Sequence, residues 1–162
     1  MPDNARPLAA VTTPEKKEMT RAARVNLKRS ECAVVVSQKL VDQTAKIAKI
    51  GRRSQMVQSL LNSYHLLEGM RLLSPTPISN SELRVFHSED YVAFLEKPDE
   101  VSEENFGLGY DCPVVADLGE FVRWIAGGSI AAADALVSGQ ARVAFNWHGG
   151  WHHAKAHTPH KI

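Results

Sequence analysis

The sequence has few of the features that mark secreted, membrane-spanning or nucleic-acid-binding proteins. It holds two cysteines, Cys32 and Cys112, in 162 residues. Two are too few for a disulfide framework and indicate a reducing compartment. No apolar run approaches the ~18 residues of a membrane span, and the N-terminus lacks the apolar core of a signal peptide. The formal net charge is only +1, so we expect no direct binding to nucleic acid or to membranes.

The rest of the composition is that of an ordinary globular protein, apart from one end of the chain. Apolar residues make up 44% and charged residues 23% of the sequence, and a domain of this length buries roughly 70% of its unfolded surface. Residues 1–30 are basic and contain few large apolar side chains, so we predict a disordered tail there. Glutamates interrupt its basic residues, which favours a solvated tail over a nuclear import signal.

Apolar periodicity predicts alternating strands and helices beyond this tail. The β-branched run CAVVVS of residues 32–37 indicates a buried strand. Apolar residues recur at helical spacing after Arg52, and this spacing predicts a helix that Gly69 ends. His65, within that helix, is expected at the surface. The prolines of residues 74–82 predict a loop.

Two further helices and one more strand are predicted in the second half of the chain. Ser88 and Asp117 can each cap a helix at its start. The pair Gly127-Gly128 weakens the second of these helices, unless a neighbouring segment packs closely there. Residues 141–147 are typical of a strand. This order favours an α/β fold with a parallel sheet flanked by helices, in which ligands bind beyond the carboxyl ends of the strands.

The end of the chain, NWHGGWHHAKAHTPHKI, gathers five of the seven histidines. Two pairs of them stand four residues apart, and on a helix such pairs share a face that could bind zinc. Two glycines and Pro159 disfavour a helix, and position 154 lacks the glutamate of a protease-type H-E-x-x-H motif. Proton transfer by the adjacent pair His152-His153 is a second interpretation, because histidine suits acid–base catalysis near neutral pH. Exposed tail histidines are the third.

Four segments together resemble the zinc-dependent histone deacetylases, and class I in particular. They are FNWHGGWHHAK (residues 145–155), FGLGYDCP (106–113), FHSEDYVAFL (86–95) and KIGRRSQMVQSLLNSYHLL (49–67). Residues 31–155 therefore resemble the N-terminal part of a histone deacetylase domain, and residues 156–162 form a divergent C-terminal tail. The resemblance implies an arginase-like α/β fold, present here only as its N-terminal portion.

This resemblance also implies an activity, the zinc-dependent hydrolysis of the N-acetyl amide on lysine side chains of histones or other proteins. His153 would be the main general acid–base residue and would protonate the departing lysine amine. His152 would stabilise developing charge or share the base role. Asp111 would accept hydrogen bonds from substrate backbone amides and so hold the incoming lysine.

A second set of residues implied by the resemblance shapes the pocket. Gly150 and Trp151 would contact the substrate and, together with Arg53, line the internal channel through which acetate leaves. The family further implies a chromatin regulator that works in the nucleus and the cytoplasm.

The chain departs from the family's pattern in two places. Position 148 is His where relatives commonly have a small residue, a change that a loop can tolerate or that can crowd the site. After Lys155 the family's acidic, glycine-containing stretch is not found, and its zinc ligands, an Asp-x-His segment and a further Asp, cannot be placed in the 162 residues. We identify no metal ligand and predict that this polypeptide alone has no deacetylase activity.

Three functions therefore stay open from the sequence. The first is a zinc-dependent lysine deacetylase, represented by its N-terminal part. The second is a catalytically inactive, truncated relative that acts by binding partners. The third is a histidine-rich metal-binding protein.

Overall fold

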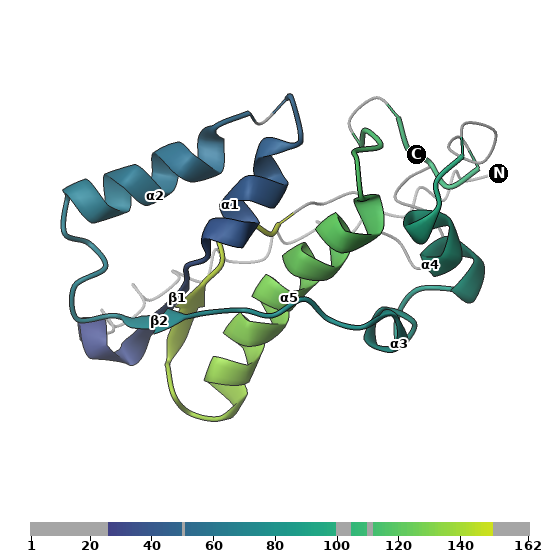
Figure 1. The fold of residues 1–162 in the computed structure, drawn as a ribbon. Coiled ribbons are helices and arrows are strands. Elements are labelled where there is room, and N and C mark those ends of the chain that lie inside the picture. The colour runs from purple at the N-terminus through teal and green to yellow at the C-terminus, as the bar shows by residue number, and fades with distance from the viewer. Residues whose placement is uncertain (1–25, 50, 100–104, 110–111, 151–162) are drawn as a thin grey trace, which may run out of the picture.

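A computed structural model describes residues 26–49, 51–99, 105–109 and 112–150 of the chain. These residues form a small parallel sheet with helices around it, and the long helix α5 lies in the middle of the view beside the strands (Figure 1). The elements are η1 Arg29–Glu31, β1 Cys32–Val35, α1 Gln38–Ala45, α2 Arg53–Ser63, β2 Arg71–Leu73, α3 Asn80–Leu83, α4 Glu89–Glu96, α5 Leu118–Val137 and β3 Val143–Phe145.

The sheet has three strands in the order β2-β1-β3, and β1 runs parallel to both neighbours. Ala33 pairs with Arg71 of β2 on one side and with Ala144 of β3 on the other. All four residues of β1 are buried, as expected for a central parallel strand covered on both faces. The predicted α/β fold with a parallel sheet is confirmed, and the strand predicted at residues 141–147 is the shorter β3, at the edge of the described sheet.

The helix α5 approaches its neighbours closely at two glycines. A Cβ atom on Gly127 would lie 1.9 Å from the carbonyl oxygen of Thr76, in the loop before α3. A Cβ atom on Gly128 would lie 3.2 Å from both the Leu40 side chain and the Asn146 amide nitrogen. Neighbouring segments thus pack closely against this glycine pair, which is the condition under which the sequence allowed an intact helix here.

The core divides into two apolar clusters. The larger one joins α4 to α5 and the segments beside them, and its buried members are Ile47, Tyr91, Phe94, Leu95, Leu108, Leu118 and Phe121. The rings of Phe94 and Phe106 stack in it with centroids 4.6 Å apart. The smaller cluster packs α5 onto the sheet through Ala33, Ala135 and Ala141. Small side chains there let the helix lie close to β1 and β3.

Neither helix cap predicted from the sequence forms as expected. Ser88 and Asp117 occupy the N-cap positions of α4 and α5, but neither side chain makes a capping hydrogen bond. Asp117 is in the left-handed region with φ 56°, and its carboxylate instead lies 3.5 Å from the Lys46 ammonium group. The tertiary ion pair replaces the local capping bond.

Other expectations were wrong at element boundaries. The segment predicted as a loop at residues 74–82 contains the start of α3, where Ser79 and Glu82 form a reciprocal capping box. The helix that begins near Arg52 ends at Ser63 and does not reach Gly69. His65 lies beyond the helix end and is exposed, as expected. The strand β2 and the helix α1 were not predicted.

The predictions for the two ends of the chain stay untested. Residues 1–25 and 151–162 lie outside the described residues, so the divergent tail and the disorder of residues 1–25 remain predictions. The last residues of the predicted tail, Arg29 and Ser30, lie in η1. Within the part of the chain that the structure describes, no helix is long and apolar enough to cross a membrane.

We predict that Gly127→Ala destabilises the fold although alanine favours helices. The new methyl group meets a backbone oxygen that cannot rotate away. Overpacking costs roughly 1–3 kcal/mol, more than the helix propensity of about 1 kcal/mol that alanine adds. Urea unfolding followed by circular dichroism measures the difference.

Gly128→Ala is the matched control, because its methyl group meets only side-chain atoms at 3.2 Å or more. We expect a smaller loss for it than for Gly127→Ala. Equal or higher stability of Gly127→Ala relative to the unsubstituted chain would contradict the described packing.

Candidate functional site

The candidate site lies where β3 ends. Residues 146–150 form a turn directly after the carboxyl end of this strand. Parallel sheets of this kind bind ligands beyond the carboxyl ends of their strands. The first half of the histidine-rich segment therefore stands at the edge where the topology favours a site.

Asn146 fastens this turn to α5. Its amide nitrogen donates a hydrogen bond to the Ser129 hydroxyl at 3.2 Å, and its amide oxygen accepts one from the His148 backbone N–H at 3.2 Å. A Cβ atom on Gly149 would lie 3.0 Å from the Asn146 amide nitrogen and 3.1 Å from the Ser129 hydroxyl. The turn can lie this close to α5 because glycine stands at position 149.

Gly150 continues the turn with φ +88°. Glycine adopts this backbone region without the steric cost that a Cβ atom brings. No atom lies within 4 Å of a Cβ atom placed there. The backbone angle, and not crowding, therefore calls for glycine at position 150.

On the opposite side, the turn packs against α2 and β1 through His148. This residue is 5% exposed. It lines a tight space whose other walls include Val35 of β1, the following Val36, and Ser54 and Gln58 of α2. Burial lowers the pKa of the His148 imidazole, because the low-dielectric surroundings disfavour its charged form.

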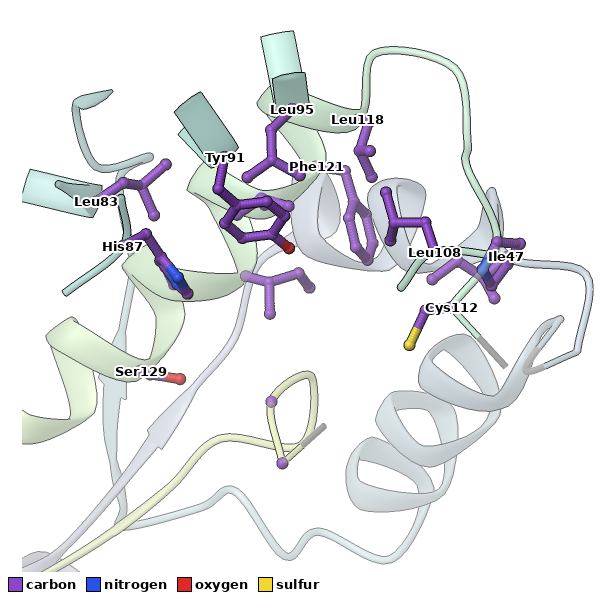
Figure 2. A pocket seen from close by; sticks show the side chains of 16 residues that line it. Ile47, Leu83, His87, Tyr91, Leu95, Leu108, Cys112, Leu118, Phe121 and Ser129 are labelled. Carbon is purple, nitrogen blue, oxygen red and sulfur yellow. The ribbon is translucent and has the colours of Figure 1, made fainter. Parts of the chain in front are cut away.

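A mostly apolar cavity of about 300 Å³ opens beside the same turn. Figure 2 shows its wall from α4 and α5 facing the loop of residues 149–150, with the Tyr91 hydroxyl and the Cys112 sulfur directed inward. The lining residues are Ile47, Leu83, His87, Tyr91, Leu95, Leu108, Cys112, Pro113, Leu118, Phe121, Val122, Ile125, Ala126, Ser129, Gly149 and Gly150. Apolar walls with few polar groups are typical of small-molecule sites.

Tyr91 is a titratable group in the wall of this cavity, and its pKa is strongly shifted. Tyr91 is 7% exposed, and burial raises the pKa of its phenol to about 12, with a smaller electrostatic contribution from Cys112. The phenol is therefore neutral at physiological pH and can serve as a hydrogen-bond donor.

The described residues do not form a metal site. Within them, no three His, Cys, Asp or Glu side chains come together in a way that could hold a metal ion.

Of the site residues predicted from the sequence, two are described and four are not. Gly150 lines the cavity, and Arg53 is the first residue of α2 with an exposed side chain. Asp111, Trp151, His152 and His153 lie outside the described residues. The structure therefore places the turn that leads into the histidine pair, and the roles of all six residues stay predictions.

Sequence reasoning missed several residues that shape the site. Asn146 and Ser129 were not singled out, although a polar side chain directly after a strand and a hydroxyl directly after the glycine pair were visible signals. Tyr91 and Leu95 stand four residues apart on one face of α4, which could have indicated a shared wall. The burial of His148 had no local signal, because it depends on contacts with α2 and β1.

Comparison with known proteins identifies what this chain resembles. A family profile described as "Histone deacetylase domain" matches residues 46–160. The chain is 39% identical to histone deacetylase 8 of Xenopus tropicalis over 114 residues and 39% identical to histone deacetylase 8 of Danio rerio over 127 residues. It is also 42% identical to histone deacetylase HDAC1 of Drosophila melanogaster over 110 residues. The resemblance to class I members, histone deacetylase 8 among them, is confirmed.

These matches cover most of this chain but a minor part of each relative. The aligned residues are 67%, 75% and 64% of this chain, and 31%, 34% and 21% of the respective relatives. The chain thus spans about a third or less of the length of the curated relatives it matches.

We predict that Tyr91 makes stability fall at high pH. Its pKa in the folded protein, about 12, lies above the usual value of 10.0, so the folded state retains a proton that the unfolded state loses. The stabilisation is complete below pH 10 and is lost as the pH rises toward 12, by up to about 3 kcal/mol at about 1.4 kcal/mol per pKa unit. Urea unfolding at pH 9 to 12, compared with Tyr91→Phe, measures it.

Tyr64→Phe is the control, because the Tyr64 side chain is 70% exposed. It should show the same pH dependence as the unsubstituted chain, whereas Tyr91→Phe should lose the component between pH 10 and 12. Parallel decline of the unsubstituted chain and Tyr91→Phe would show that the phenol is not buried as described.

Proposed function

Because this chain belongs to the histone deacetylase family, we propose that its protein is a lysine deacetylase, which hydrolyses the N-acetyl amide of lysine side chains in histones or other proteins. The observation that carries the proposal is the profile match over residues 46–160. That match includes both the turn at residues 146–150 and the segments that line the cavity beside it.

In this proposal the adjacent histidines perform the proton transfers. His153 protonates the lysine nitrogen as the amide bond breaks, since an amine leaves far more readily in its protonated form. His152 takes the neighbouring position and shares the base role, so the two imidazoles titrate as a coupled pair. The turn at residues 146–150, held by Asn146 to α5, leads directly into this pair.

Substrate positioning falls to residues on either side of the histidines. Asp111 accepts hydrogen bonds from backbone amides of the substrate, which fixes the lysine side chain relative to the reacting centre. Gly150 leaves open space in the cavity, and Trp151 supplies a rigid wall. Arg53 lines the path by which acetate leaves.

Zinc is the cofactor of the family, yet the described residues of this chain do not fit it. They contain no group of three ligating side chains, and the 162 residues contain no Asp-x-His segment. We therefore assign this chain only the proton-transfer and substrate-positioning side of the site. We further propose that these 162 residues do not deacetylate by themselves.

The proposed substrates are acetylated lysines of proteins in the nucleus and the cytoplasm. The small net charge of +1 gives no reason to propose direct binding to nucleic acid.

A chimera tests the proposed activity. Residues 46–155 of this chain replace the aligned residues in histone deacetylase 8 of Xenopus tropicalis, and acetate release from an acetyl-lysine peptide is measured with added zinc. We expect turnover by the chimera, and a loss of roughly 10²–10⁴-fold on His153→Ala, the usual range for a general acid–base residue. The 162-residue chain alone should show none.

His65→Ala is the control within the chimera, because His65 is exposed and should leave turnover unchanged. A folded, zinc-loaded chimera without turnover would refute the deacetylase role of these residues. Turnover by the 162-residue chain alone that disappears on His153→Ala would refute the claim that it is inactive by itself.

A further inference from the structure

The cavity beside the turn of residues 146–150 interrupts the larger apolar cluster of the core. Tyr91, Leu95 and Phe121 belong both to that cluster and to the cavity wall. Close-packed protein interiors contain few voids larger than a water molecule, whereas this cavity has a volume of about 300 Å³. An apolar cavity of about 150 Å³ is enough to bind benzene. The space therefore accommodates a ligand of roughly two fused rings.

The wall of this cavity favours an uncharged ligand. Lys, Arg, Asp and Glu are all missing from its described lining residues, whereas aliphatic side chains such as Leu95 of α4 and Val122 and Ile125 of α5 are present. A charged molecule would lose its hydration here without gaining a carboxylate, ammonium or guanidinium partner from this wall. An uncharged, mostly apolar molecule loses little hydration and buries its surface.

The Tyr91 hydroxyl is a buried polar group that the wall directs into this space, and Figure 2 shows it pointing inward from α4. Tyr91 is 7% exposed, and among the described residues its hydroxyl has no hydrogen-bond partner. Buried polar groups without a partner are rare in folded proteins, and each calls for an explanation. An acceptor atom on a bound molecule would supply the missing partner.

The direction of this hydroxyl is fixed before a ligand enters. The Tyr91 ring lies edge-on to the His87 ring at 5.2 Å and packs on the Phe106 ring at 5.5 Å between centroids. Phe106 in turn stacks on Phe94. Because burial raises the pKa of the phenol to about 12, the hydroxyl keeps its proton at neutral pH and can donate it. A donor that is already oriented lowers the entropic cost of binding.

We propose that this cavity binds a small, uncharged, mostly apolar molecule with one carbonyl group, and that the Tyr91 hydroxyl donates a hydrogen bond to the carbonyl oxygen. A carbonyl suits the site because it accepts without bringing a donor that the apolar walls would leave unpaired. An aromatic ketone is the simplest molecule of this class. Gly150 is the one described residue that the cavity shares with the proposed deacetylation site, and the proposal does not rest on that function.

A matched pair of probes tests the proposal on the whole chain. 2-Acetylnaphthalene carries the carbonyl, and 2-isopropenylnaphthalene has nearly the same shape with a CH₂ group in place of the oxygen. Dissociation constants come from titrations followed by nuclear magnetic resonance of labelled methyl groups. We expect both probes to bind and to shift the methyl signals of Leu95 and Ile125, which line the cavity. The methyl signals of Val137, which is 89% exposed, should stay in place.

Tyr91→Phe separates the hydrogen bond from the burial of apolar surface. It removes only the hydroxyl, so it should weaken the binding of 2-acetylnaphthalene about two- to tenfold, the range of one net hydrogen bond. The binding of 2-isopropenylnaphthalene should stay the same. Tyr64→Phe is the matched control, because Tyr64 is 70% exposed, and it should change neither affinity. Ala126→Leu fills the cavity from α5 and should weaken the binding of both probes.

Three results would overturn the proposal. They are no saturable binding of either probe up to its solubility limit, shifts confined to residues outside the cavity wall, and equal effects of Tyr91→Phe on the two probes. If Tyr91→Phe does not fold, nuclear Overhauser effects in the unsubstituted chain decide. Contacts between the acetyl methyl group of the probe and the Tyr91 ring protons would support the proposal, and their absence from the bound state would overturn it.

Discussion

The close approach of α5 to its neighbours at Gly127 and Gly128 is the constraint on which the rest of the structure depends. Because Gly127 has no Cβ atom, the Thr76 carbonyl comes within a distance of it that no side chain permits, and the Asn146 amide packs tightly against Gly128. Thr76 belongs to the loop between β2 and α3, and Asn146 follows β3. One face of one helix thus sets both the path of the chain toward α4 and the start of the turn at the candidate site.

From this constraint the site follows in two steps. Asn146, bonded to Ser129, positions the turn at residues 146–150, and His148 packs the far side of the turn against α2 and β1. The cavity then lies between this turn and the wall formed by α4 and α5 (Figure 2). In the proposed function, this turn directly precedes the catalytic histidine pair. Its hydrogen bond to α5 helps to position the pair, as general acid–base catalysis requires.

The sequence predicted those features that a local pattern determines. The β-branched run of β1 and the strand before the turn agree with the structure, because buried strands appear in the sequence as short apolar runs. The caps at Ser88 and Asp117 did not form as predicted, since Asp117 pairs with Lys46, far away along the chain. The helix α3 was missed because its four residues carry no periodicity. The strand β2 has only three residues, too few to alternate.

The candidate site, like the fold, was only partly predictable from the sequence. Motif resemblance located the turn and its glycines, and the family match confirms that resemblance. The Asn146–Ser129 bond, the raised pKa of Tyr91 and the burial of His148 arise only from tertiary contacts, so the sequence could not predict them.

The most direct measurement of the link between α5 and the turn is amide hydrogen exchange in Asn146→Ala. We expect the His148 amide, which donates to Asn146, to lose protection from exchange, while the Val34 amide of β1 keeps its protection. Unchanged protection of the His148 amide would contradict the claim that Asn146 links the turn of residues 146–150 to α5.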